Sequence, residues 1–118
     1  MKKSIAIVGR TNVGKSLLFN KLTRAKKSLV IDYHGVTRDI NTGYLHFGNK
    51  SFYIEDTGGI PEKNDKFSSK ILEKASKSIS KADLILFVVS ASDGLTYQDQ
   101  EICKMLRKLN RDILLIIN

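Results

Sequence analysis

The segment Gly9-Arg10-Thr11-Asn12-Val13-Gly14-Lys15-Ser16 decides the fold of this 118-residue chain. It matches the pattern G-x-x-x-x-G-K-[ST] of loops whose backbone N–H groups point at phosphate oxygens. A short apolar run, Ile5 to Val8, precedes it, and apolar residues at helical spacing follow it, namely Leu18, Phe19, Leu22 and Ala25. A strand before the loop and a helix after it are the required context, so we predict a phosphate site rather than a chance glycine turn.

The conserved positions of the pattern each have a chemical reason. Gly9 and Gly14 permit backbone angles and close approaches that a side chain would block. Lys15 would reach the β- and γ-phosphates, and the Ser16 hydroxyl would bind Mg²⁺. The predicted nucleotide-binding residues of the loop and first helical turn are Asn12, Val13, Gly14, Lys15, Ser16 and Leu17.

Strand-like and helical patterns alternate along the rest of the chain. We expect a loop over 28–39, a hairpin of Tyr44–Phe47 and Ser51–Ile54 around Gly48-Asn49-Lys50, a loop over 57–66, a helix over about 67–81, a strand over Leu84–Ser90 and a turn at Ser92-Asp93-Gly94. Ile102, Met105, Leu106 and Leu109 then predict an amphipathic helix, and the apolar run at 113–117 a buried strand. The predicted fold is α/β, a mostly parallel sheet with one antiparallel hairpin.

Composition limits the class of protein. The chain is 42% hydrophobic and 27% charged, as in soluble globular domains, and its single cysteine, Cys103, cannot form a disulfide within the chain. The apolar run after Lys2 and Lys3 is too short for a signal peptide or a membrane span, so we expect a cytoplasmic protein without a membrane partner. The net charge of +8 raises affinity for polyanions in general.

Two later segments have the order expected of a nucleotide switch. Asp56-Thr57-Gly58-Gly59 reads D-x-x-G at the end of a predicted strand, where Asp56 would contact Mg²⁺ through its outer shell and Gly59 would offer its amide to a γ-phosphate. Thr37 lies in the first long loop and could supply a second hydroxyl ligand to Mg²⁺. The phosphate loop alone does not separate GTP from ATP, so another P-loop enzyme that uses ATP stays an alternative.

The chain resembles the first GTPase domain of the EngA/Der family, bacterial GTPases of the Era-like branch. The similarity lies in "GRTNVGKSLLFNKL", "GVTRD", "EDTGGI" and "ADLILFVVSASDGLTYQDQEI", in the family's order and approximate spacing. It implies a Ras-like P-loop fold, Mg²⁺ held by Ser16, Thr37 and Asp56, catalytic roles for Lys15, Thr37 and Gly59, and K⁺ near Asn12. It also implies hydrolysis of GTP to GDP and phosphate in the full-length parent, and a part in assembly of the large ribosomal subunit.

The resemblance also gives meaning to single positions. Asn118 corresponds to the first residue of the guanine-recognition motif N-K-x-D, so we expect residues 1–118 to be an incomplete GTPase domain, cut at the start of that motif. Ile60 replaces the glutamine that orients water in Ras-like enzymes, which implies slow hydrolysis. His34 replaces a proline of the family, which could loosen the first loop. Ser90 replaces an aspartate, and the sequence offers no account of that change.

Basic side chains gather on two predicted helices. Lys70, Lys74, Lys77 and Lys81 fall on one helical face, and Lys104, Arg107, Lys108 and Arg111 group on the next helix. Such faces could contact ribosomal RNA phosphates, or they could be ordinary solvated surfaces. The remaining alternative for the whole chain is an incomplete binding or interaction module that turns over no nucleotide.

Overall fold

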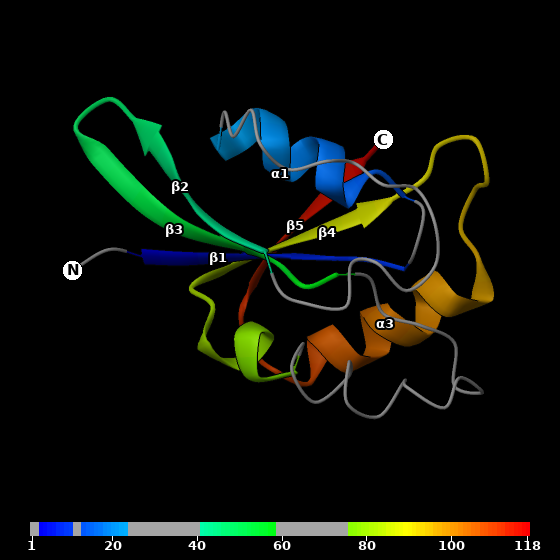
Figure 1. The fold of residues 1–118 in the computed structure, drawn as a ribbon. Helices are drawn as coiled ribbons and strands as arrows, with labels where there is room; N and C mark the ends of the chain where they lie inside the picture. The colour runs from blue at the N-terminus through cyan, green and yellow to red at the C-terminus, as the bar shows by residue number, and fades with distance from the viewer. Residues whose placement is uncertain (1–2, 11–12, 24–40, 59–75) are drawn as a thin grey trace.

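The fold is described from a computed structural model, which covers residues 3–10, 13–23, 41–58 and 76–118. Five strands of the described residues form one sheet in the order β2-β3-β1-β4-β5 (Figure 1). Their bounds are Lys3–Val8 (β1), Asn41–Phe47 (β2), Lys50–Asp56 (β3), Leu84–Val89 (β4) and Asp112–Ile117 (β5). β2 and β3 pair antiparallel, and all other neighbours pair parallel. The predicted sheet with one antiparallel hairpin is therefore confirmed.

Helices cover both faces of this sheet. The helix α1, Lys15–Thr23, lies on one face, and α3, Tyr97–Arg107, lies on the other beside the helical residues 76–81 (Figure 1). Alternate residues of β1 supply the two cores: Ala6 and Val8 pack with Ile102 and Leu106, whereas Ile7 packs on the side of α1. Because β1 and β4 are covered on both faces, their continuous apolar runs are explained.

The prediction of a buried strand at the end of the chain is wrong. β5 forms as expected, but Leu114 and Leu115 are each 54% exposed and Ile117 is 68% exposed. Among the described residues the strand lies at the edge of the sheet and pairs with β4 alone. An apolar run predicts a strand, but coverage depends on the strand's place in the sheet, which a local pattern does not contain.

Other predicted elements need smaller corrections. The turn of the hairpin is Gly48-Asn49, since Lys50 already belongs to β3. α3 ends at Arg107, so Leu109 follows the helix and packs half-buried against the core. Residues 28–39 of the first predicted loop, residues 59–66 of the next loop and residues 67–75 of the helix predicted over about 67–81 lie outside the described residues. No helix in the described part of the chain is long and apolar enough to cross a membrane.

Candidate phosphate-binding site

The phosphate loop and the D-x-x-G segment meet because β1 and β3 are parallel neighbours. Ile7 of β1 is in register with Asp56 of β3. Just beyond the strands, the backbone N–H and the hydroxyl of Thr57 both donate to the carbonyl of Ile7, at 3.2 and 2.8 Å. Both loops therefore leave the sheet at the carboxyl ends of adjacent strands, where open α/β sheets bind ligands.

Ser16 and Asp56 form the oxygen-rich part of this site. The Ser16 hydroxyl lies 3.4 Å from Asp56 Oδ2, and the backbone N–H of Gly58 donates to Asp56 Oδ1 at 3.1 Å. A hydroxyl and a buried carboxylate are ligands that suit Mg²⁺, so these residues fit the predicted ion. No group of three His, Cys, Asp or Glu side chains that could hold a metal occurs in the described residues.

Lys15 is buried at the start of α1. Its Nζ donates to the backbone carbonyl of Arg10 at 3.2 Å. Burial lowers the pKa of the Lys15 ammonium, and the nearby charge of Asp56 partly offsets that effect. A desolvated cation with a hydrogen bond to the loop backbone is placed to exchange that carbonyl for a phosphate oxygen.

The backbone of the first helical turn is also suited to anions. The first bond within α1 runs from the N–H of Leu18 to the carbonyl of Gly14, at 3.1 Å. The N–H groups of Lys15, Ser16 and Leu17 precede that bond, at the positive end of the helix. These three N–H groups are therefore placed where a phosphate could bind.

Both glycines of the motif are required, for different reasons. A Cβ on Gly9 would lie 2.7 Å from the carbonyl oxygen of Val88, so close packing against β4 excludes a side chain. Gly14 has a φ of 91°, which L-residues rarely adopt. A Cβ there would also collide with the side-chain amide of Asn118.

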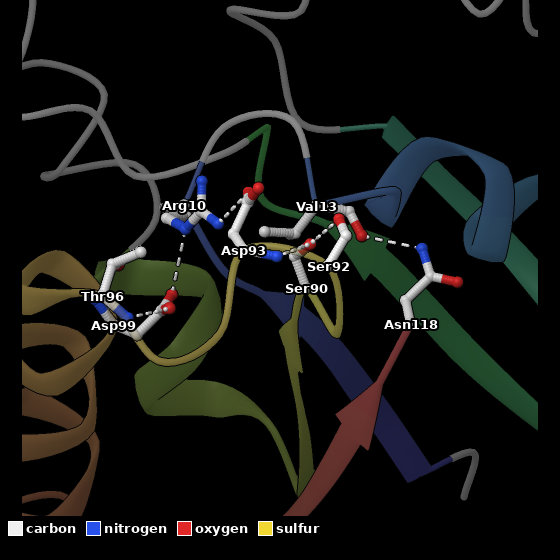
Figure 2. Close-up of polar contacts among 8 residues, drawn as sticks. All are labelled: Arg10, Val13, Ser90, Ser92, Asp93, Thr96, Asp99 and Asn118. Atoms are coloured by element: carbon white, nitrogen blue, oxygen red, sulfur yellow. Dashed lines mark hydrogen bonds and ion pairs between the residues drawn. The ribbon is translucent and has the colours of Figure 1, made fainter.

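Asn118 joins the phosphate loop from the far end of the described chain (Figure 2). Its backbone continues the β4–β5 ladder: its N–H donates to Val89 at 2.9 Å, and its carbonyl accepts from Ala91 at 2.7 Å. Its Nδ2 donates to the carbonyl of Val13 at 2.8 Å. Asn118 thus supports the loop, while its predicted role toward a guanine base stays a prediction.

Arg10 is a residue of the loop that received no role from the sequence. The Arg10 side chain contacts Asp93 after β4 and Asp99 of α3, as Figure 2 shows. Thr96-x-x-Asp99 carries the signature of a helix capping box, and the structure contains it. That signature could have located the start of α3, but nothing in it points to Arg10.

Several predicted site residues lie outside the described part of the chain. They are Asn12, Thr37 and Gly59; His34 and Ile60, the two positions noted as departures from related GTPases, also lie there. The structure therefore brings together Val13, Gly14, Lys15, Ser16, Leu17, Asp56 and Asn118 from the predicted set.

Comparison with known proteins decides the family. A family model described as "50S ribosome-binding GTPase" matches residues 4–118. The chain belongs to this family. It is 43% identical over 118 residues to the GTPase Der of Nitrosococcus oceani, and 46% identical over 115 residues to the GTPase Der of Caldanaerobacter subterraneus subsp. tengcongensis. The first match includes 100% of this chain and 25% of the relative, and the second includes 97% of this chain and 26% of the relative. The chain therefore spans about a quarter of the length of these relatives. The resemblance to Der is confirmed.

Solved structures confirm the Ras-like P-loop GTPase fold. A variant of Aquifex aeolicus Era bound to GDP and AlF4⁻ has a TM-score of 0.88 and 36% identity, over all of this chain and 41% of that one. Era in complex with MgGDPNP and a segment of 16S ribosomal RNA has a TM-score of 0.88 and 35% identity. The G domain of T. maritima FeoB shares the fold at 23% identity, with a TM-score of 0.68.

Proposed function

We propose that this chain is the phosphate-binding part of a GTP-binding switch domain, and that the protein carrying it hydrolyses GTP slowly to GDP and phosphate. One observation carries the proposal: Lys15, Ser16 and Asp56 converge at the carboxyl ends of β1 and β3, beside the N-terminal amides of α1. The family match over residues 4–118 supports GTP rather than ATP, and so does the GDP bound to the similar Era structure.

The residues divide the chemistry between them. The amides of Lys15 and Ser16 bind phosphate oxygens, and the Lys15 ammonium leaves the Arg10 carbonyl to reach the β- and γ-phosphates. Ser16 and Asp56, with Thr37, would hold Mg²⁺, which when bound neutralises charge on the phosphates. In this proposal Gly59 senses the γ-phosphate, and K⁺ binds beside Asn12. These positions follow from the family resemblance.

Guanine recognition is part of the proposal. Residues 1–118 belong to one GTPase domain, and Asn118 is the first residue of its base-recognition motif. The contact of Asn118 Nδ2 with the Val13 carbonyl supports this assignment, because it places the motif next to the loop that holds the phosphates. The base and the phosphates of one nucleotide would then be bound by connected elements.

We extend the proposal to the ribosome. In the protein that carries this chain, the cytoplasmic GTPase would bind ribosomal RNA and assist assembly of the large subunit. The family description supports a ribosomal partner, and the similar Era binds a segment of 16S RNA. Exposed basic side chains are available on α3 and just after it, namely Lys104, Arg107 and Lys108.

Nucleotide binding tests the function directly. Fluorescent GDP and ATP are titrated against the protein with Mg²⁺, and we expect GDP to bind at least about a hundredfold more tightly, roughly 2.7 kcal/mol. Ser16→Ala should reduce the gain in GDP affinity that Mg²⁺ gives. Ser80→Ala, at an exposed position in residues 76–81, should leave that gain unchanged. Equal affinity for GDP and ATP would reject guanine specificity.

Turnover tests the enzymatic part. GTP hydrolysis is measured in K⁺ and in Na⁺ at equal ionic strength, and we expect K⁺ to give the faster rate. Equal rates would remove the proposed role of Asn12. GDP binding without any Mg²⁺-dependent turnover would favour the alternative of a binding module.

A further inference from the structure

The Arg10 side chain is held by two carboxylates that come from distant parts of the chain. Its Nη2 lies 2.6 Å from Asp93 Oδ2, and its Nε lies 3.3 Å from Asp99 Oδ1 (Figure 2). The side chain is only 13% exposed. The hydrogen bond to Asp93 raises the pKa of the Arg10 guanidinium above its usual value, although burial acts in the opposite direction. Arg10 is therefore a fixed cation at the first variable position of the phosphate loop.

Asp99 is the buried partner of this cation. Its side chain is fully buried, and its Oδ2 accepts the backbone N–H of Thr96 at 3.0 Å, within the capping box of α3. Its Oδ1 has no hydrogen-bond partner among the described residues and faces Arg10 as a charge contact. A buried carboxylate requires a counter-charge, so Arg10 is tied to the start of α3.

Asp93 is itself held in place by the turn after β4. The Ser90 hydroxyl accepts the backbone N–H of Asp93 at 3.3 Å and lies 3.0 Å from the hydroxyl of Ser92. This gives Ser90 a structural role that its sequence position did not reveal. The turn presents Asp93 toward Arg10.

The backbone of Arg10 connects this clamp to the phosphate site. Its carbonyl accepts the hydrogen bond from Lys15 Nζ, at 3.2 Å. We propose that Arg10 is a positioning residue: Asp93 and Asp99 hold its side chain, which fixes the loop backbone in the shape that receives a nucleotide polyphosphate. The proposal deepens the GTPase assignment and rests on it for the identity of the nucleotide.

An arginine near a phosphate loop could instead bind phosphate itself. That would require Arg10 to leave the fully buried Asp99 without a counter-charge. The two roles make opposite predictions for Asp99→Asn. If Arg10 positions the loop, the weaker clamp reduces nucleotide affinity; if Arg10 binds phosphate, its release increases affinity.

The test compares variants that keep the local packing. Arg10→Lys retains the charge but loses the fork that reaches both carboxylates, and Asp99→Asn can still accept the Thr96 N–H. We expect each to raise the Kd for GDP about tenfold, with the KM for GTP raised and kcat changed less than about twofold. The double variant should raise the Kd for GDP little more than either single change, because each single change already breaks the contact between Arg10 and Asp99. Arg111→Lys is the matched control, since Arg111 donates to Ser80 away from the loop.

A second readout does not depend on nucleotide. Amide hydrogen exchange of residues 13–17 in the nucleotide-free protein should accelerate in Arg10→Lys and Asp99→Asn but not in Arg111→Lys. Unchanged exchange together with unchanged GDP affinity would overturn the positioning role, and tighter GDP binding by Asp99→Asn would assign Arg10 to phosphate. If the protein binds no guanine nucleotide, the GTPase proposal fails, while the exchange rates still decide the role of Arg10.

Discussion

Gly14 allows a prediction whose magnitude follows from two separate features of the site. Replacing it with alanine places a side chain at a φ of 91°, which costs about 1–3 kcal/mol for a non-glycine residue. The new Cβ also displaces the Asn118 amide, so the bond from Nδ2 to the Val13 carbonyl is lost. That bond contributes about 0.5–1.5 kcal/mol. Gly14→Ala should therefore lower the free energy of unfolding by roughly 1.5–4.5 kcal/mol.

A double-mutant cycle separates the two contributions. Asn118→Ala alone should cost about 1 kcal/mol, because it removes only the bond to Val13. In that background the Cβ of Ala at position 14 no longer meets an amide, so the double variant should be about as stable as Gly14→Ala alone. The expected coupling energy is about 1 kcal/mol, measured by urea unfolding without nucleotide or Mg²⁺.

Gly94 provides the matched control for the backbone effect. Its φ is 71°, and a Cβ there would meet nothing within 4 Å. Gly94→Ala should lower the free energy of unfolding by about 1 kcal/mol, and by the same amount whether position 118 holds Asn or Ala. If the costs of Gly14→Ala and Asn118→Ala simply add, the amide does not limit the space at Gly14 and the reasoning is refuted.

Two further predictions concern the helices of the site. Lys15→Met should raise the free energy of unfolding of the nucleotide-free protein by roughly 1–3 kcal/mol while abolishing GDP binding, because a buried ammonium is replaced by an apolar chain. As a control, Lys21→Met at an exposed position should change the free energy of unfolding by less than about 0.5 kcal/mol. If Lys15→Met does not stabilise the protein, the Lys15 ammonium is not desolvated. Thr96→Ala should lower the free energy of unfolding by about 1 kcal/mol, because the Thr96 hydroxyl no longer accepts the Asp99 N–H, whereas Thr96→Ser should keep most of that stabilisation. Equal losses in thermal unfolding of the two variants would argue against the cap.

Much of the fold could be predicted because its signals are local. The phosphate-loop pattern, the short apolar runs and the helical spacing each depend on a few neighbouring residues. β1, the hairpin and β4 follow from such patterns. β5 shows the limit: its apolar run predicts a strand correctly, but the exposure of Leu114 and Leu115 depends on the strand order, which places β5 at an edge.

The candidate site divides in the same way. The phosphate-loop pattern predicts a site from Gly14, Lys15 and Ser16 because the chemistry restricts each position, and the structure places the three at the start of α1. Asp56 is expected at the site as the first residue of D-x-x-G at a strand end, and the parallel pairing of β1 with β3 explains how it reaches the phosphate loop. The contact between Asn118 and Val13 spans 105 residues, so its geometry required the structure even though the family pattern marked the position.

Arg10 shows what a motif omits, and why. It occupies a position that the phosphate-loop pattern leaves free, because the role of its side chain comes from residues 83 and 89 positions away. Parallel pairing of β1 with β4, with Val8 in register with Phe87, places the end of β1 beside the turn that carries Asp93. Once the strand order is known, a cation at position 10 and a carboxylate after β4 are expected to meet. Variable positions of such a loop are therefore best interpreted after the sheet order, since the neighbouring strand determines which partners they have.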